Sequence, residues 1–398
     1  MENNTQLKEM IRSMVIDVLQ GQNQESASSQ PIKQAPRDQV EPGVFDTVDD
    51  AIQAAKAAQA RFEDCTLATR EKVIADIRAA MRPRVQELAQ KTVEETGMGR
   101  VADKVLKLNL TLDKTPGVED LVTECETGDN GMTLYELSAY GVIGAITPST
   151  NPAETLICNT IGMLAAGNAV FFSVHPGAKH LSRLLVSELN QIIAKSIGIE
   201  NLIVTLREPS IESAQEMMLH PDVSLLVVTG GPGVVKQALQ SGKKVIGAGA
   251  GNPPAFVDET ADIKKAAQDI VLGASLDNNI LCIAEKSVVA MRQIEPQLVQ
   301  EMVKAGCVLI ENQQDIQRLV DLTVLPNGTP NKKFVGKNAS VILDAAHIPY
   351  NGDPRLIIMR TPKDHPFAVI EMLMPILPVV TVDSFDEGLD VCLMLEAG

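Results

Sequence analysis

Short apolar runs alternate with helical segments through the middle of the chain. The runs are rich in Val, Ile and Leu, and the segments between them repeat apolar residues at helical spacing. The predicted strands are residues 141–147, 168–174, 201–206, 224–230 and 243–247, and the predicted helices are residues 152–166, 177–197, 210–219 and 231–241. Near-continuous apolar strands that alternate with helices are typical of a parallel sheet covered on both faces. We therefore predict an α/β domain here.

A second alternating series begins near residue 255. Its predicted strands are residues 254–259, 286–291, 307–311, 340–344 and 354–359, and its predicted helices are residues 260–273 and 295–305. This series predicts a second α/β domain. The chain would then divide into residues 44–254 and residues 255–398.

Helical segments and a hairpin precede the first series. The predicted helices are residues 48–97, divided at Pro83, and residues 100–115. Within residues 118–140, Asp129-Asn130-Gly131 lies between two β-prone runs. An Asn-Gly pair in that position is typical of a β-hairpin turn.

Residues 1–20 form an amphipathic segment of their own. From residue 4 onward, apolar side chains recur at the positions of one helical face. Residues 21–43 are polar and rich in Gln, Ser and Pro, as in a flexible linker. A helix on such a linker favours docking to a partner over packing on its own domain, which is the alternative. Its polar face mixes acidic and basic residues, which argues against binding to a membrane surface.

Composition narrows the class of protein. The 398 residues are 45% hydrophobic and 3% aromatic, with a net charge of -16. Such a chain repels phosphate backbones and offers little stacking surface, so we expect no nucleic-acid partner. The six cysteines form no CxxC pair and the histidines show no metal-ligand spacing, so we expect neither disulfides nor a metal site. No apolar run is long enough to cross a membrane and no signal peptide is apparent, so we expect a cytoplasmic protein.

Three loops follow strands of the first series and carry small and polar residues: residues 147–152, 173–179 and 229–233. The carboxyl ends of parallel strands and the N-termini of helices are where nucleotides bind in α/β proteins. None of the loops has the G-x-G-x-x-G pattern. The glycine run at residues 247–251 continues into Asn-Pro-Pro, which does not open a helix in the usual register. Nucleotide binding and ordinary turn chemistry therefore both remain open.

Cys282 is the candidate nucleophile. It follows two asparagines and precedes the predicted strand at residues 286–291. A thiolate is a strong nucleophile, but a cysteine among apolar residues is more often a small core residue. Composition does not separate Cys282 from Cys158 or Cys307, so its role stays open at this level.

A set of motifs resembles those of the coenzyme-A-acylating aldehyde dehydrogenases, within the aldehyde dehydrogenase superfamily. The motifs are ETGMGR (95–100), TPGVEDL (115–121), TPSTNP (147–152), AAGNAVFFSVHPGAK (165–179), VVTGGPG (227–233), KKVIGAGAGNPP (243–254), VDETAD (257–262), DNNILCIAEK (277–286) and HPFAVIEMLMPILPVV (365–380). The resemblance is strongest to the propionaldehyde and acetaldehyde dehydrogenases of bacterial microcompartments. It implies an aldehyde dehydrogenase-like α/β fold. Residues 44–254 would be a Rossmann-like NAD domain, residues 255–398 a catalytic domain, and residues 118–140 an oligomerisation hairpin.

The resemblance also implies roles for individual residues. Cys282 would attack the aldehyde, pass a hydride to NAD+ and hold the acyl group as a thioester. The oxyanion site would combine the backbone N–H of Cys282 with either Thr150 or Asn151. The residues that would bind NAD are Ser173 and His175 at the adenosine ribose, Thr229, Gly230 and Gly231 at the pyrophosphate, Gly249 in the glycine run, and Glu371 at the nicotinamide ribose.

One difference from the hydrolytic relatives has chemical meaning. Those enzymes carry a water-activating glutamate in the run that matches residues 247–251, which here holds only glycine and alanine. Without that base, coenzyme A rather than water should take the acyl group, so the expected product is acyl-CoA. The expected substrate is a short-chain aldehyde, propionaldehyde before acetaldehyde. A hydrolytic enzyme and a non-catalytic microcompartment cargo are the alternatives.

The resemblance gives both ends of the chain a meaning. In the resembling enzymes a helix and linker such as residues 1–20 and 21–43 direct the enzyme into the microcompartment, so we expect a shell protein as partner. The hairpin implies a homo-oligomer. The family's chains extend past the position that matches Gly398, so we expect a catalytic domain that is incomplete at its C-terminus.

Overall fold

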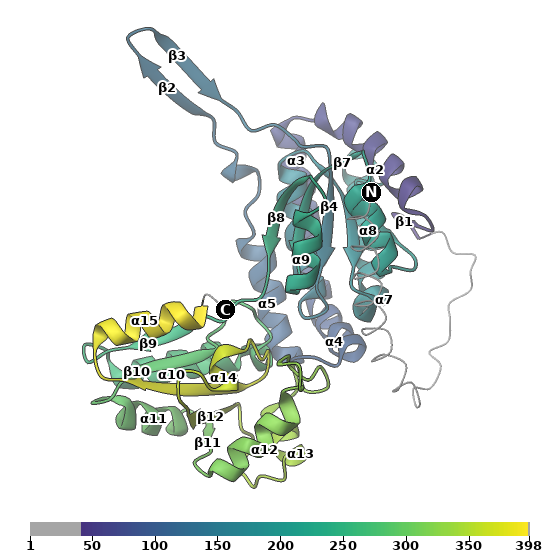
Figure 1. Ribbon diagram of the computed structural model, residues 1–398. Coiled ribbons are helices and arrows are strands. Elements are labelled where there is room, and N and C mark those ends of the chain that lie inside the picture. The colour runs from purple at the N-terminus through teal and green to yellow at the C-terminus, as the bar shows by residue number, and fades with distance from the viewer. Residues whose placement is uncertain (1–40, 397–398) are drawn as a thin grey trace, which may run out of the picture. The chain divides into compact units, whose positions relative to one another are not determined.

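The computed structural model describes residues 41–396, and the chain from Glu41 onward forms one compact unit. Two parallel sheets and a separate hairpin make up its strands (Figure 1). The predicted docking helix, residues 1–20, and all but the last residues of the predicted linker, residues 21–43, lie outside the described residues.

The first sheet has the strand order β1-β6-β5-β4-β7-β8, and all neighbouring strands run parallel. The strands are β1 (Val44–Phe45), β4 (Val142–Thr147), β5 (Ala169–Val174), β6 (Ile203–Leu206), β7 (Val223–Thr229) and β8 (Lys244–Ala248). Every residue of β4 and β5 is buried, which explains why their sequences are continuously apolar. The strands predicted between residues 141 and 247 are confirmed, and β1 is an addition that the sequence pattern does not predict.

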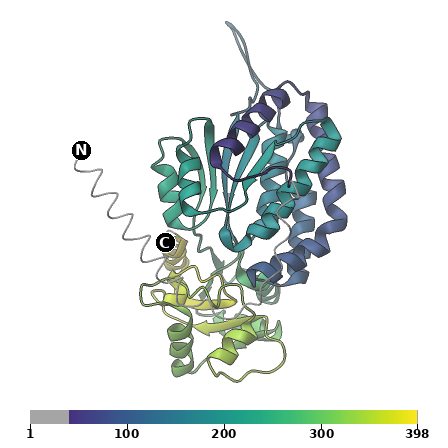
Figure 2. The same cartoon turned by 90° about the vertical axis from the view of Figure 1, so that its right-hand side faces the viewer.

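Helices cover this sheet on both faces (Figure 2). The helices α6 (Pro152–Ala165) and α7 (Lys179–Ile197) contact strands between β4 and β6, as do α2 (Val48–Glu63) and α8 (Ile211–Leu219). The helix α9 (Pro232–Leu239) contacts β7 and β8. This arrangement confirms the predicted sandwich of helices around a parallel sheet. None of the helices within residues 41–396 has the length and apolar character to span a membrane.

The segment before the first sheet is helical, as predicted. It forms α2, α3 (Leu67–Met81), α4 (Val85–Thr96) and α5 (Val101–Lys114). Pro83 lies in a short 3-10 helix, Arg82–Arg84, which separates α3 from α4 because proline lacks the N–H that would continue the α-helix. Gly97 ends α4 in the left-handed conformation at φ 66°.

The predicted hairpin is formed by β2 (Glu124–Gly128) and β3 (Gly131–Tyr135), joined by a two-residue turn. All residues of both strands are exposed, and the two strands pair only with each other within residues 41–396. Figure 1 shows the hairpin projecting from the first sheet.

The second sheet has the parallel order β11-β12-β13-β10-β9. Its strands are β9 (Pro254–Val257), β10 (Ser287–Met291), β11 (Cys307–Leu309), β12 (Leu356–Arg360) and β13 (Ile376–Val382). Its helices are α10 (Ile263–Ser275), α11 (Glu295–Lys304), α12 (Gln313–Thr323), α13 (Ala339–Ala345), α14 (Pro366–Val369) and α15 (Phe385–Glu396). The change from the first sheet to the second falls between β8 and β9. The division into two domains at residues 254 and 255 remains a prediction.

One predicted strand is wrong. Residues 340–344 belong to α13 and not to a strand. Ala339, Ile342 and Leu343 are buried while Val341 is 45% exposed, which is the three-to-four residue spacing of a helical face. In a run this short, apolar content alone does not distinguish a helix from a strand. The strand β13 and the helix α12 are further elements that the sequence pattern does not predict.

Candidate active site

Cys282 lies in a loop between a short 3-10 segment, Leu276–Asn279, and β10, and its side chain is exposed. The three residues Asp277, Asn278 and Asn279 all have positive φ, at 50°, 57° and 64°. Apart from glycine, Asn and Asp tolerate this left-handed region best because their short polar side chains bond locally. All three are almost completely buried. The DNN sequence thus turns the chain sharply just before the candidate nucleophile.

Side-chain amides hold this turn in place. The Nδ2 of Asn279 donates to the backbone oxygens of Ala274 (2.7 Å) and Glu285 (3.0 Å), which close the loop around Cys282. The Nδ2 of Asn278 donates to the backbone oxygen of Gly336 at 2.8 Å. These bonds satisfy buried backbone carbonyls that have no sheet partner.

Lys286 supports the same loop from inside. It is 3% exposed, and its Nζ donates to the backbone oxygens of Leu281 (2.6 Å), Asn279 (3.2 Å) and Ala284 (3.3 Å). Burial lowers the pKa of Lys286 to about 8, and the charges of Glu371 and Cys282 oppose that shift. Glu371 and Cys282 therefore lie within electrostatic range of Lys286. The sequence pattern does not predict Lys286 as a site residue, although a lysine immediately before a fully buried strand is an unusual signal.

Glu371 and the end of the glycine run meet at this loop. Burial raises the pKa of Glu371, while Lys286 and a backbone hydrogen bond from Gly251 oppose the rise. A Cβ added at Gly251 would lie 3.0 Å from the backbone oxygen of Cys282. The structure thus brings Cys282, Lys286, Glu371 and Gly251 into one place, although only Cys282 and Glu371 are predicted site residues.

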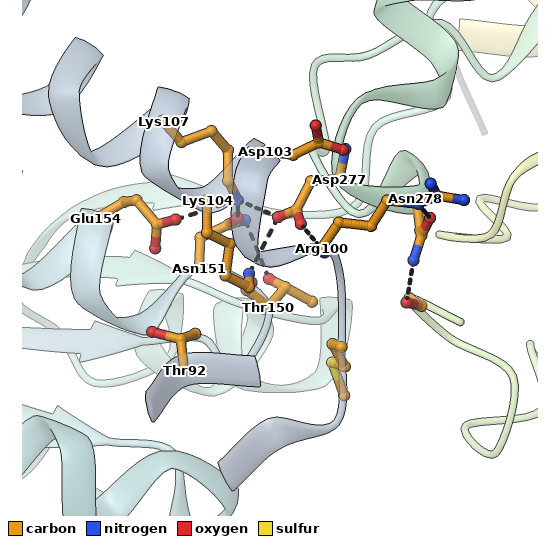
Figure 3. Close-up of polar contacts among 12 residues, drawn as sticks. Thr92, Arg100, Asp103, Lys104, Lys107, Thr150, Asn151, Glu154, Asp277 and Asn278 are labelled. Atoms are coloured by element: carbon orange, nitrogen blue, oxygen red, sulfur yellow. Dashed lines mark hydrogen bonds and ion pairs between the residues drawn. The ribbon is translucent and has the colours of Figure 1, made fainter. Parts of the chain in front are cut away.

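Thr150 and Asn151 lie in the loop between β4 and α6, and two lysines of α5 contact them (Figure 3). The Nζ of Lys104 donates to the backbone oxygen of Thr150 at 3.3 Å, and the Nζ of Lys107 donates to Oδ1 of Asn151. Both ammonium groups also pair with Oδ2 of Asp277, at 3.0 and 2.5 Å. The predicted oxyanion loop is therefore tied to the loop of Cys282 through residues that the sequence analysis misses.

The residues predicted to bind NAD lie at the carboxyl edge of the first sheet. Ser173 is the residue before the last of β5 and lies next to Ile146 of β4, and Thr229 ends β7 next to Ala248 of β8. The strand order reverses between β4 and β7, and ligands of open α/β sheets bind at such a point. Ser173 and Thr229 are separated by β4, so the structure brings them to one edge but not into a single cluster.

The remaining predicted residues lie in the loops after these strands. The Nδ1 of His175 accepts the Gly177 N–H at 3.0 Å, and desolvation of the imidazole together with the charge of Lys332 lowers its pKa. Gly231 is the exposed residue that precedes α9, and Gly230 donates its N–H to the Ala248 oxygen at 3.1 Å. A Cβ added at Gly231 or at Gly249 would meet nothing within 4 Å. These loops therefore leave open space along their backbone.

Comparison with known proteins identifies the family. Residues 19–392 match the sequence profile of the Aldehyde dehydrogenase family. The chain belongs to the aldehyde dehydrogenase family. Its membership agrees with the parallel sheets described above and with the motifs found in the sequence.

Individual family members are similar over most of their length. The chain is 49% identical over 357 residues to propanal dehydrogenase (CoA-propanoylating) of Salmonella typhimurium, covering 89% of this chain and 76% of that protein. It also resembles the structure of Rhodopseudomonas palustris propionaldehyde dehydrogenase with bound CoA and an acylated cysteine, at a TM-score of 0.87 and 47% identity, covering 90% of this chain and 82% of that one.

A second similar structure is a propionaldehyde dehydrogenase from the fucose utilisation bacterial microcompartment of Clostridium phytofermentans. It has a TM-score of 0.87 and 47% identity and covers 90% of this chain and 82% of that one. These similarities confirm the predicted fold class and the predicted group of acylating aldehyde dehydrogenases within the family.

Proposed function

We propose that the chain oxidises a short-chain aldehyde, propionaldehyde in the first place, with NAD+ and coenzyme A to acyl-CoA and NADH. The observation that carries this proposal is the exposed Cys282, which follows a buried turn and lies next to a glycine run without a carboxylate. The similarity to a CoA-propanoylating propanal dehydrogenase supports the choice of substrate and acceptor.

The residues present fit a nicotinamide dinucleotide. Gly231 and Gly249 leave their backbone accessible at the carboxyl edge where the strand order reverses, which suits an approaching pyrophosphate. Thr229 and Gly230 would contact the same group, and Glu371 would accept hydrogen bonds from ribose hydroxyls near Cys282. Ser173 and His175 would lie at the adenosine ribose. When bound, NAD+ supplies the acceptor for the hydride.

The reaction steps follow from Cys282. Its sulfur adds to the carbonyl carbon of the aldehyde, and the carbonyl oxygen becomes an oxyanion. The backbone N–H of Cys282 and the side chain of Asn151 or Thr150 would donate hydrogen bonds to that oxygen. When the carbonyl re-forms, the hydride leaves carbon and a thioester remains on Cys282. Lys286 provides a positive charge within electrostatic range of the sulfur.

The second half-reaction releases the product. The thiolate of coenzyme A attacks the thioester carbon, and the Cys282 thiolate leaves, so acyl-CoA forms and the nucleophile is restored. In residues 247–251 no carboxylate is present to activate water, so hydrolysis of the thioester should be slow.

The test is NADH formation from propionaldehyde, with and without coenzyme A, by the wild-type chain and by Cys282→Ser. We expect steady NADH formation that requires coenzyme A, prefers propionaldehyde over acetaldehyde and is lost in Cys282→Ser. Full-rate turnover without coenzyme A would instead indicate a hydrolytic enzyme. A wild-type chain that forms no NADH would favour the non-catalytic alternative.

We further propose that the protein is cargo of a bacterial microcompartment and a homo-oligomer. The similarity to a microcompartment propionaldehyde dehydrogenase supports the first point. The hairpin supports the second, because Met132, Leu134 and Leu137 are all at least 60% exposed and an isolated two-stranded hairpin is marginally stable. Co-purification of a reporter fused to residues 1–20 with shells, and the mass of the protein in solution, test the two points. A diffuse reporter or a monomeric mass would refute them.

A further inference from the structure

The side-chain amide of Asn151 has two chemically different ends, and only one of them can serve an oxyanion. The NH2 group can donate to a negatively charged oxygen, whereas Oδ1 would repel it. An asparagine in an oxyanion site must therefore be held in one of its two amide orientations. Free rotation of the amide would present the wrong end part of the time.

Lys107 determines which way this amide lies. Its Nζ donates to Oδ1 of Asn151, so the NH2 group is directed away from the lysine. The partner of this NH2 group within residues 41–396 is Oγ1 of Thr150 at 3.3 Å, which leaves its second hydrogen available. Thr150 and Asn151 are the two residues between which the sequence left the oxyanion donor open, and at Asn151 this hydrogen is free for that role.

The ammonium group of Lys107 is itself fixed. Lys107 is 6% exposed and its Nζ lies 2.5 Å from Oδ2 of Asp277 and 3.3 Å from Oε1 of Glu154. Lys104 pairs with the same oxygen of Asp277 at 3.0 Å, so two lysines and two carboxylates form a buried group of balanced formal charge (Figure 3). The network leaves the ammonium of Lys107 few alternative positions.

Asp277 connects this group to the nucleophile. It lies five positions before Cys282 in the turn with positive φ, and its Oδ1 accepts the backbone N–H of Arg100 at 2.8 Å. A Cβ at Gly99 would lie 2.0 Å from Oδ1 of Asp277, so the close approach of α5 to this carboxylate requires glycine there. The carboxylate that anchors Lys107 is thus part of the turn that presents Cys282.

We propose that Lys107 is a positioning residue, which holds the NH2 group of Asn151 toward the substrate oxygen and, through Asp277, keeps it in a fixed relation to Cys282. The inference rests on the proposed function, because it assigns Asn151 the oxyanion role. Lys107 itself contacts neither substrate nor cofactor. Its effect on the reaction passes through Asn151.

The test is a double-mutant cycle in the full chain, with the single-turnover rate of NADH formation from propionaldehyde as the first measurement. Asn151→Ala should lower that rate about 100- to 1,000-fold, as the loss of one oxyanion donor does. Lys107→Met should lower it about 10- to 100-fold, with the affinity for NAD+ unchanged. In the Asn151→Ala background, Lys107→Met should have no further effect on the rate. Equal rate losses in both backgrounds, or no loss from Lys107→Met alone, would overturn the proposal.

Two further variants separate positioning from folding. Lys107→Met/Glu154→Gln removes one positive and one negative charge, and we expect the same rate loss as in Lys107→Met, with a melting temperature closer to wild type. Lys114→Met makes the same change at an exposed position of α5 and should change the rate less than 2-fold. If Lys107→Met/Glu154→Gln has the wild-type rate, the rate loss in Lys107→Met comes only from the Glu154 carboxylate that this substitution leaves without its partner, and the proposal is wrong.

The melting temperatures of the four proteins of the double-mutant cycle distinguish failure of this inference from failure of the proposed function. These proteins are the wild type, Asn151→Ala, Lys107→Met and Asn151→Ala/Lys107→Met. If Lys107 holds Asn151, the decreases in melting temperature of Asn151→Ala and Lys107→Met, added together, should exceed the decrease measured for Asn151→Ala/Lys107→Met. Additive decreases in melting temperature would refute the contact between Lys107 and Asn151, even if the enzyme is active. If the wild-type chain forms no NADH but the decreases in melting temperature are non-additive, the proposed function is refuted while the contact between Lys107 and Asn151 is supported.

Discussion

The loop of Cys282 and the loops at the carboxyl edge of the first sheet are held by different means. The turn before Cys282 has buried side chains, positive φ at three consecutive residues and a buried carboxylate shared by two lysines. The loops after β7 and β8 are largely exposed and rely on the strands and on backbone hydrogen bonds such as Gly230 to Ala248. The loop of Cys282 therefore depends on contacts between residues far apart in the chain, whereas the loops after β7 and β8 depend on the ends of their own strands.

This difference suits the two tasks. A nucleophile and an oxyanion donor must keep a relation of a few tenths of an ångström during covalent chemistry, so a buried network of directional contacts is favourable. A dinucleotide must enter and leave, and open glycine backbone allows it to do so. We therefore expect substitutions in the buried network to change stability, and substitutions in the open loops to change binding alone.

The largest effect should come from Asp277→Asn. It leaves Lys104 and Lys107 buried with one carboxylate fewer, and breaking a buried ion pair on one side destabilises by about 3–5 kcal/mol. Urea unfolding measures the loss. Asp269→Asn removes an exposed pair with Lys265, both more than half exposed, and should leave the midpoint of urea unfolding almost unchanged, because solvent screens such pairs. Equal effects of the two substitutions would contradict the contrast between buried and exposed contacts.

A smaller effect should appear as a pH dependence. The pKa of Lys286 falls to about 8 in the folded protein from 10.5, so between these values the unfolded chain binds more protons than the folded one. The unfolding free energy should therefore rise with pH through this group. Relative to Lys286→Met, the wild type should gain about 2 kcal/mol between pH 7 and pH 9.5, at about 1.36 kcal/mol per pH unit above 8. Urea unfolding of both proteins across this range checks it, and a difference independent of pH would speak against a buried, titrating ammonium.

The smallest effect on stability should come from Gly231→Ala. The added methyl group would meet nothing within 4 Å, so the free energy of unfolding should change by less than about 0.5 kcal/mol. If Gly231 lies against the pyrophosphate, the KM for NAD+ should nevertheless rise several-fold. Gly162→Ala, an exposed position inside α6 that also has open space, is the matched control and should leave this KM unchanged. An unchanged KM in Gly231→Ala would remove this loop from the proposed cofactor site.

The secondary structure was largely predictable from local pattern. The five strands β4 to β8 of the first sheet, the division at Pro83 and the hairpin turn at Asp129-Asn130 all follow from short stretches of sequence, because apolar period and backbone restrictions act locally. The strands β1 and β13 and the helix α12 are not predicted, and residues 340–344 are predicted wrongly. There the apolar run was short enough to fit either a strand or a helix, and packing inside the second half of the chain decided for the helix.

The candidate site was only half predictable. The motifs single out Cys282, Thr150, Asn151 and the cofactor loops, and the aldehyde dehydrogenase family membership supports the chemistry that they imply. Lys104, Lys107 and Lys286 were not recognisable as site residues, because a lysine in a helix or before a strand is ordinarily solvated. Only burial gives each of them its role.

The sequence by itself thus determined which elements form, which family the chain resembles and which residue types are available for thiol chemistry. These properties depend on side-chain periodicity and on motifs of adjacent residues. The tertiary structure alone decided that the carboxylate of Asp277 meets two lysines of α5 and that one of them holds the amide of Asn151. Contacts between residues 44 to 173 positions apart in the chain leave no local pattern. The strength of a charge or a hydrogen bond there depends on exclusion of water, which only the folded protein provides.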